Sequence, residues 1–249
     1  MIDVILGFLA LGRHLSSKKE QNQSLTKQAY SQLRNDIVCI VFPQQAKLNI
    51  ESLKKSYNMG GTPIREALNQ LVAEKMVTAL PLRGFQVAAV TPEQLADIYN
   101  NRALIEKEML QQVMAKEDDF WESQCVASLY RIKKSVANEE FSSGDDVQKW
   151  LKLSAMFYNN LLGAVESDWL RHIQGLLYMH SQRYESLFCK QIEDLNAYVK
   201  KQHRAFKQLL NCCLANEVIE AVSMHENYLH KQKKMLADSV DLLGKDNAR

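Results

Sequence analysis

The stretch from residue 59 to residue 91 constrains the fold of this chain most, because its pattern changes from helix to strand within a few residues. It reads MGGTPIREALNQLVAEKMVTALPLRGFQVAAVT. Thr62 can cap a helix, and Pro63 suits the first helical position. The apolar residues that follow at helical spacing are Ile64, Leu68 and Leu71. This pattern predicts a helix with one apolar face.

Directly after this helix, apolar residues recur as they do in short strands. Val77 and Ala79 come first, and the pair Arg83-Gly84 then has the chemistry of a turn. The second alternating run consists of Phe85, Val87 and Ala89. The order of helix, strand, turn and strand predicts a recognition helix followed by a β-wing with a basic tip.

Two further helices are expected before the recognition helix. Residues 25–40 carry apolar residues at helical spacing, and LNIESLKKSYNM gives a short helix with Leu53 facing inward. Gly60 and Gly61 then form a flexible turn before the recognition helix. The second and third helices are therefore joined as a helix-turn-helix requires.

The runs TPIREAL, LVAEKMV and RGFQVA occur together in this order. Together they resemble the winged helix-turn-helix of the GntR family of bacterial transcription regulators. The resemblance implies a DNA-binding domain over residues 24–90, with double-stranded DNA as its partner. These residues contain eight Lys and Arg side chains against four acids, whereas the whole chain has a net charge of +2.

The resemblance also indicates which side chains contact DNA. Arg65 is the first choice for a base contact, because a guanidinium can bind guanine with two hydrogen bonds. Thr62 either binds phosphate or only caps the helix, and Asn69 is a weaker candidate for a base contact. The candidates for contacts with the DNA backbone and at the wing are Lys54, Lys55, Arg83 and Gly84, and each of these cations is also explicable as a solvated surface charge.

The sequence departs from the well-known members of the family at two positions. Glu51 and Gly61 stand where arginines are expected. Either the operator differs from the operators of those members, or affinity depends more on backbone and wing contacts.

The remaining composition predicts a cytoplasmic protein without a membrane partner. The apolar run from residue 4 to residue 11 is too short to span a bilayer, and we expect residues 1–23 to be a disordered or loosely helical extension. The chain has five cysteines, and none shows the C-x-x-C spacing of zinc or redox sites. Reduced thiols are the simple interpretation.

Residues 91–240 are expected to form an all-helical domain, followed by a tail at 241–249. No proline occurs after Pro92, and Thr91-Pro92-Glu93-Gln94 fits a capping box. Helical segments are predicted at about 92–116, 118–137, 145–164, 168–190, 192–215 and 217–240. The predicted fold class is therefore mainly α: a winged helix-turn-helix with a small β-wing, and a helical bundle.

The helical part resembles the effector domain of the FadR subgroup, usually called FCD. The run Asn101-Arg102-Ala103-Leu104-Ile105-Glu106 is similar to the step that opens this domain, and His203 and His225 match its last two metal-ligand histidines. The remaining two ligands, an Asp and a His, align with Ser154 and Tyr158. A neutral serine and tyrosine cannot replace these ligands, so we expect a half-lost site. Zinc or nickel at His203 and His225 is the alternative, and no cofactor is certain.

Without a metal, the histidines become candidates for effector binding. With Arg102, Ser154 and Tyr158, the residues His203 and His225 could bind the carboxylate of a small organic acid. Arg183 is another candidate partner for an anion. The alternatives are two histidines satisfied in the protein interior and a surface ion pair at Arg183.

These observations predict a homodimeric transcription regulator, not an enzyme. Two recognition helices would bind an inverted-repeat operator, and a small carboxylate would modulate binding. Repression is expected, because competition with polymerase is the simplest output. The alternatives are a helical metal-binding enzyme that uses His203 and His225, or a DNA-binding dimer with a degenerate, ligand-free bundle.

Overall fold

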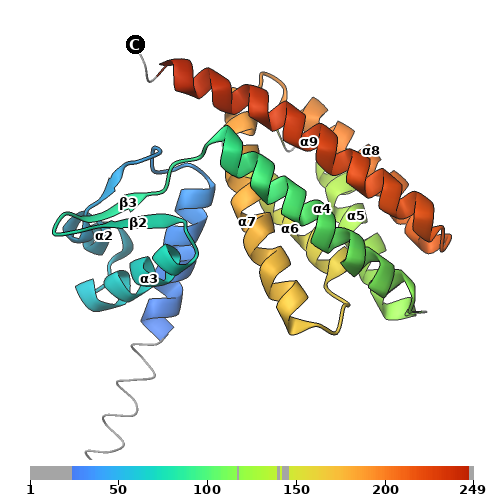
Figure 1. Cartoon of the computed structure of the whole chain (residues 1–249), viewed down its shortest axis with the longest axis horizontal. Coiled ribbons are helices and arrows are strands. Elements are labelled where there is room, and N and C mark those ends of the chain that lie inside the picture. Colours follow the sequence, from blue (N-terminus) through green and yellow to red (C-terminus); the bar gives the residue numbers. More distant parts are fainter. Residues whose placement is uncertain (1–23, 117, 139–140, 142–145, 247–249) are drawn as a thin grey trace, which may run out of the picture. The chain divides into compact units, whose positions relative to one another are not determined.

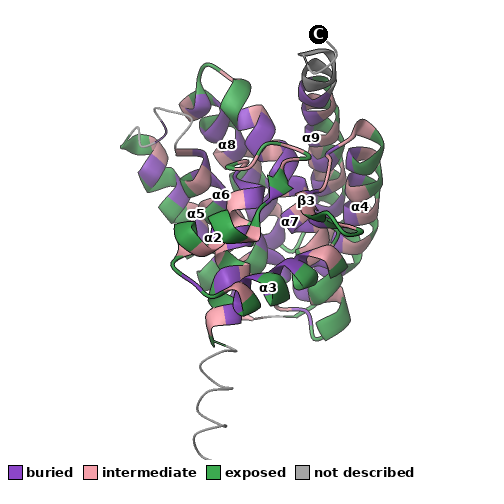
Figure 2. Cartoon of the chain, turned by 90° about the vertical axis from the view of Figure 1, so that its left-hand side faces the viewer, coloured by how far each residue is buried: buried purple, intermediate pink, exposed green. Residues whose placement is uncertain are grey.

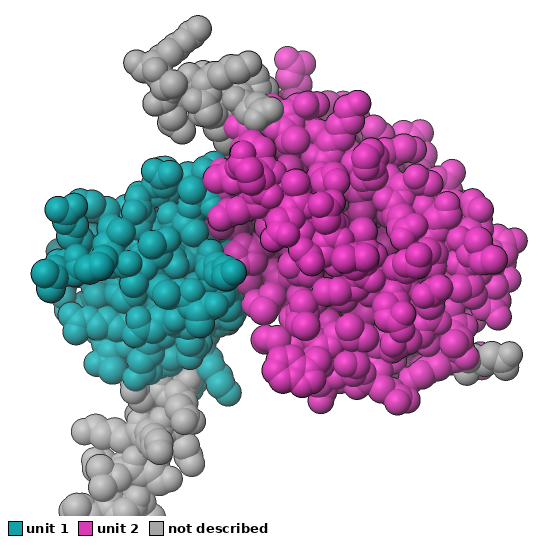
Figure 3. Space-filling model, in the orientation of Figure 1, with its two compact units in different colours: residues 1–89 teal, residues 90–249 magenta. Residues whose placement is uncertain are grey.

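A computed structural model describes residues 24–246 except 117, 139–140 and 142–145, with side chains described up to residue 240. The chain divides into two compact units, with the boundary between Ala89 and Val90 (Figures 1 and 3). The predicted extension at residues 1–23 lies outside the described residues. The mainly helical fold with a small sheet is confirmed.

The first unit contains three helices and a small sheet. The helices span residues 24–38, α2 Ile50–Tyr57 and α3 Gly61–Ala73, and the strands are β1 Lys47–Leu48, β2 Val77–Leu80 and β3 Gly84–Val87. The antiparallel strands have the order β1-β3-β2, so β1 completes the wing sheet. The sequence prediction missed β1.

The core of this unit follows from the predicted apolar faces. The side chains with no exposed surface are Ala29, Leu33, Ile37, Ile64, Ala67, Leu68 and Leu71. Thr26 Oγ1 donates to Glu66 Oε2 at 2.6 Å, and Tyr30 OH donates to Glu74 Oε1 at 2.7 Å. These hydrogen bonds join the helix at 24–38 to α3, in addition to the packing of apolar side chains.

The start of α3 differs from the prediction. The helix begins at Gly61 with Gly60 as its N-cap, which provides no side-chain hydrogen bond. Thr62 is therefore inside the first turn, and its predicted role as the cap is wrong. The preceding helix α2 is closed by Asn58, whose left-handed φ of 51° leaves only a short connection before Gly61.

The second unit contains six α-helices within the described residues. They are α4 Pro92–Met114, α5 Asp119–Ala137, α6 Val147–Leu162, α7 Asp168–Gln191, α8 Leu195–Leu214 and α9 Val218–Asp246. In Figure 2 buried residues run along the helices as stripes, as their apolar periodicity predicts. The last helix continues through Asp246, past the predicted start of a tail at residue 241.

Side-chain caps explain where several of these helices begin. Thr91 Oγ1 accepts a hydrogen bond from the Gln94 amide at 3.2 Å, and Asp118, Ser167 and Asp194 cap α5, α7 and α8 in the same way. Tyr184 OH of α7 accepts from the Thr91 amide at 3.3 Å and donates to the Thr91 carbonyl at 3.1 Å. Thr91 is thus held both by α4 and by α7.

Aromatic side chains fill the centre of the helical unit. The Phe206 ring stacks on Phe157 with 4.6 Å between centroids and on Trp150 with 6.0 Å. Trp150, Phe157 and Phe206 are at most 1% exposed. Among the helices of the described residues, none is long and apolar enough to cross a membrane.

Candidate functional site

The outward face of α3 carries a stripe of polar side chains. Thr62, Arg65 and Asn69 are all exposed and follow one another at intervals of three and four residues, which places them on one side of the helix. Ile64 and Leu68 on the opposite side are fully buried. The core therefore fixes the helix while this stripe remains available to a partner.

Two lysines of α2 lie before this helix. Lys54 Nζ forms an ion pair with Glu51 Oε2 at 2.8 Å, and both side chains are solvent-accessible. Lys55 is exposed. The Lys54 ion pair is weak because water screens it, so a phosphate could compete with Glu51.

The wing presents its turn to solvent. The amide of Arg83 donates to the Leu80 carbonyl at 3.0 Å, and Gly84 has a φ of +89°, which a side chain would strain. Arg83 is exposed, and Leu82 is fully exposed with a left-handed φ of 59°. The wing tip thus combines a cation with an apolar side chain that has no cover within the unit.

These features together can recognise DNA. A helix whose exposed polar stripe contains an arginine fits the major groove, where Arg can read guanine, and a two-stranded wing can contact the adjacent backbone. The first turn of α3 also has amide groups without a side-chain cap, which favour phosphate. The predicted DNA-binding residues are therefore all on the surface.

A second cluster is buried inside the helical unit. Arg102 and Glu106 lie one turn apart on α4 and are 3% and 0% exposed. Arg102 Nε donates to Glu106 Oε1 at 2.8 Å, and a second bond of 3.2 Å joins the NH2 nitrogen to Oε2. The NH1 nitrogen donates to Ser181 Oγ at 3.0 Å. The pair is bidentate, which is the strong geometry for Arg and carboxylate.

Three tyrosine rings surround the guanidinium of Arg102. The guanidinium carbon is 5.1 Å from the Tyr99 centroid, 5.4 Å from Tyr158 and 5.0 Å from Tyr178. Ring faces stabilise a desolvated cation, so these tyrosines offset part of the cost of burying Arg102.

Glu106 also contacts His225 of α9 and Gln174 of α7. His225 Nε2 lies 2.8 Å from Glu106 Oε2, and Gln174 Nε2 donates to Oε1 at 3.2 Å. Burial raises the pKa of Glu106, but Arg102 and His225 beside it lower the pKa to about 2. Glu106 is therefore ionised and accepts hydrogen bonds from three helices.

The cluster contains two buried polar atoms that have no hydrogen-bond partner among the described residues. They are Tyr158 OH and His225 Nδ1. The two rings are 5.9 Å apart. The neighbouring Ser154 Oγ already donates to the Leu151 carbonyl and accepts from Tyr178 OH at 3.1 Å. A buried polar atom without a partner is costly, so a ligand that bonds to both would be favoured here.

The structure brings together four of the predicted effector residues: Arg102, Ser154, Tyr158 and His225. In the described part of the chain, no hydrogen bond, ion pair or ring contact joins His203 to them. His203 is half-buried, and its pKa is lowered by burial and by Lys207 and Lys133. Arg183 is buried beside Tyr184, and burial lowers its pKa to about 10. The use of His203 and Arg183 for effector binding stays a prediction.

The donor set of the cluster does not fit a zinc or nickel ion. The described residues contain no group of three or more His, Cys, Asp and Glu side chains that could hold a metal. Ser154 and Tyr158 are neutral, and Glu106 is already paired with Arg102. Metal binding by His203 and His225 therefore finds no support in this geometry.

The sequence analysis did not include Glu106 among the candidate site residues, although it lies at the centre of the buried cluster. It ends the Arg102-Ala103-Leu104-Ile105-Glu106 step, and the spacing of four residues is the signal that could have identified it. Such a pair is usually exposed, and only the packing of α7 and α9 over α4 buries it. Tyr99 and Tyr178 were missed because tyrosine at helical spacing also fills ordinary cores.

The exposed helix, the wing and the helical second unit define a winged helix-turn-helix DNA-binding protein with an additional α-helical domain. The model of the bacterial regulatory proteins of the gntR family matches residues 25–87. Residues 25–87 are therefore similar to the helix-turn-helix of GntR-family transcription regulators.

Relatives extend the similarity beyond this domain. The HTH-type transcriptional repressor GlaR of Escherichia coli is 26% identical over 200 residues, covering 80% of this chain and 90% of GlaR. The uncharacterized HTH-type transcriptional regulator BphR of Paraburkholderia xenovorans is 29% identical over 206 residues, covering 82% of each chain. The solved structure of E. coli McbR/YncC has a TM-score of 0.74 at 17% identity and covers 86% of this chain and 97% of its own. This last likeness supports the fold alone.

Proposed function

We propose that the chain is a homodimeric, sequence-specific repressor of the bacterial cytoplasm whose helical unit binds a small organic acid. The observation that carries the DNA-binding part is the exposed stripe of Thr62, Arg65 and Asn69 on a helix whose other side is fully buried. Two such helices related by a two-fold axis would bind an inverted repeat. Glu51 and Gly61 stand where well-known members of the GntR family have arginines. Arg65 and the wing would therefore make most of the contacts that recognise the DNA sequence.

Selection of operator sequences tests this part. The full chain would select duplexes from a random library, and binding of the selected operator would be measured by fluorescence anisotropy at several salt concentrations. Arg65→Ala should reduce discrimination between operator and random DNA by about 1–3 kcal/mol, because the guanidinium contact to base edges is lost. Lys27→Ala, an exposed cation on the helix at 24–38, is the matched control. Unchanged discrimination in Arg65→Ala would refute the assignment.

The buried cluster supports the sensing part of the proposal. Glu106 already neutralises Arg102, so we assign Arg102 to positioning and not to direct capture of the acid. The ligand carboxylate would accept a hydrogen bond from the Tyr158 hydroxyl, and a polar group of the ligand would bond to Nδ1 of His225. His225 would keep its bond to Glu106 through Nε2.

The resemblance to FCD effector domains favours the same assignment. Within that subgroup, the run REALNQLVAEKMVT with two glycines before it is most similar to the carbon-starvation-induced regulator CsiR. GlaR, one of the relatives, is named as a repressor. Ligand binding would change operator affinity only if the acid binds one arrangement of the dimer more tightly than another.

Thermal melting of the full chain with a panel of small carboxylates tests the sensing part. One acid should raise the melting temperature in a concentration-dependent manner, because a ligand that binds only the folded state stabilises it. Tyr158→Phe should remove this shift and preserve the fold. Tyr130→Phe, which changes a tyrosine that is 61% exposed, should keep it. If no acid shifts the wild type, a ligand-free bundle replaces this part of the proposal, whereas turnover of a compound would favour an enzyme.

A further inference from the structure

A second cavity lies between the last two helices of the helical unit. The segment between α8 and α9 is only three residues long, so the two helices form an antiparallel hairpin. A groove of about 670 Å³ runs between them and is lined only by their residues. This volume is in the range of sites that bind small molecules, which is about 300–1,000 Å³.

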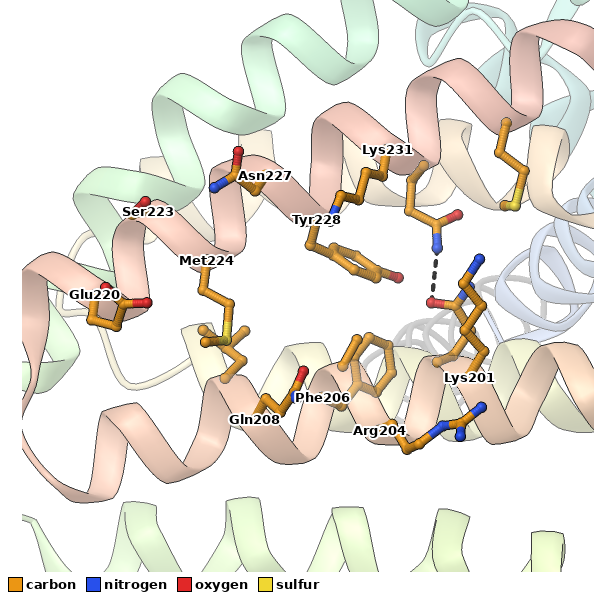
Figure 4. A pocket seen from close by; sticks show the side chains of 15 residues that line it. Lys201, Arg204, Phe206, Gln208, Glu220, Ser223, Met224, Asn227, Tyr228 and Lys231 are labelled. Atoms are coloured by element: carbon orange, nitrogen blue, oxygen red, sulfur yellow. Dashed lines mark hydrogen bonds between the residues drawn. The ribbon is translucent and has the colours of Figure 1, made fainter.

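Apolar and aromatic side chains form the floor of the groove. Phe206 of α8 and Tyr228 of α9 point into the space between the helices, and Met224 lies next to them (Figure 4). Leu209 and Met235 complete the apolar lining. Methionine and aromatic side chains adapt to flat or flexible apolar groups, so this floor suits an alkyl or aryl body.

Charged residues make the two ends of the groove different. Lys201 and Arg204 lie toward one end, and Glu220 lies at the other (Figure 4). Lys231 is eleven residues beyond Glu220 on α9, which corresponds to about 16 Å along the helix. The basic end also contains a hydrogen bond of 2.8 Å from Gln232 Nε2 to Gln202 Oε1, drawn as a dashed line in Figure 4.

The three cations have no anionic partner in the part of the chain that is described. Lys201, Arg204 and Lys231 are exposed, and none of them takes part in an ion pair there. Three cations against one carboxylate favour an anion at this end of an otherwise apolar groove. Among anions, a carboxylate suits Arg204, because Arg can bind both of its oxygens.

We propose that the α8–α9 groove binds an amphipathic carboxylate, with the carboxylate at Lys201, Arg204 and Lys231 and an apolar body over Phe206 and Tyr228. This site is separate from the buried cluster and does not depend on its assignment. The ring of Phe206 is also 5.5 Å from Tyr158, and the ring of Tyr228 is 6.4 Å from His225. An occupant of the groove would therefore touch rings that contact the buried cluster.

Calorimetric titration of the full chain with decanoate tests the proposal, and decanamide serves as the uncharged comparison. Decanoate should bind, and decanamide should bind at least tenfold more weakly. Arg204→Glu with Lys231→Glu should weaken decanoate at least tenfold. Lys207→Glu, an exposed position of α8 outside the groove lining, should leave it unchanged.

A second variant separates this groove from the buried cluster. Ala205→Trp fills the groove, so it should abolish decanoate binding without removing the melting shift caused by a small acid at Tyr158. Tyr158→Phe should have the opposite pattern. Absence of decanoate binding, or equal losses in Lys207→Glu and the double variant, would overturn the proposal. If the wild type does not bind decanoate and Ala205→Trp also loses the dimer, the groove is an interface between copies and not a ligand site.

Discussion

Replacing Glu106 with glutamine tests the buried ion pair at the centre of the helical unit. The variant keeps the shape of the side chain but leaves the guanidinium of Arg102, which is 3% exposed, without its counterion. Loss of one partner of a buried ion pair costs about 3–5 kcal/mol. The pKa of Glu106, lowered from 4.5 to about 2, gives a similar figure of roughly 3.5 kcal/mol, since each pKa unit corresponds to about 1.4 kcal/mol.

Urea unfolding of the full chain, followed by far-ultraviolet circular dichroism, measures this loss. We expect Glu106→Gln to lower the free energy of unfolding by about 3 kcal/mol at pH 7. Glu226→Gln is the matched control, because Glu226 pairs with Lys107 at 3.6 Å and both side chains are close to half exposed. The control should cost about 0.5 kcal/mol or less.

The pH dependence provides an independent check. The pKa of Glu106 is lower in the folded state than in the unfolded state, so its contribution is fully present above about pH 4.5 and is lost as the pH falls toward about 2. The wild type should lose stability in this window, and Glu106→Gln should lose correspondingly less. A variant within 1 kcal/mol of the wild type and with the same acid dependence would refute the reasoning.

Three further substitutions have expected outcomes in the same unfolding assay. Thr91→Ala removes the cap of α4 and should cost about 1 kcal/mol, and a cost near zero would mean that water replaces the hydroxyl. Leu82→Gly relieves a left-handed leucine at the wing tip and should stabilise the first unit by up to about 1 kcal/mol, whereas a destabilised variant would show that the leucine is packed. Tyr158→Phe removes a buried hydroxyl that has no described partner, so its free energy of unfolding should stay within about 1 kcal/mol of the wild type or rise. A larger loss would reveal a hydrogen bond that the hydroxyl makes.

The order of the helices could be predicted from the sequence because their signals are local. The capping threonine at residue 91 and the apolar spacing of each segment predicted helices whose described ends differ by only a few residues, apart from the last helix, which continues to Asp246. The wing was predicted from its turn residues. By contrast, β1 consists of Lys47 and Leu48, and it exists only because it pairs with Phe85 and Gln86 almost forty residues later. No local pattern marks such a pairing.

The start of α3 shows a second limit of local signals. Thr62 has the chemistry of an N-cap, yet Gly60 takes that position. The left-handed turn at Asn58 and burial of Met59, which is 8% exposed, bring the chain into helical geometry two residues earlier. Tertiary packing therefore decided between two possible starts, two residues apart, that the sequence alone could not rank.

The buried cluster was predictable only in part, because its residues come from helices that are far apart in the sequence. The spacing of Arg102 and Glu106 was visible, but their burial depends on α7 and α9. His203 and His225 matched the spacing of a metal site, yet the two differ in burial, and His225 contacts Glu106. Spacing along two helices does not fix which sides of those helices face each other.

The hydrogen bonds between Tyr184 and the backbone of Thr91 indicate where a chimaeric protein should be joined. Thr91 is held by these two bonds and caps α4, while the amide of Ala88 donates to the Met76 carbonyl of the first unit at 3.0 Å. Ala89 and Val90 lie between these two anchors. A chimaera that exchanges the DNA-reading module with that of another regulator should therefore be spliced at this dipeptide, because a junction one residue later would replace the cap of α4.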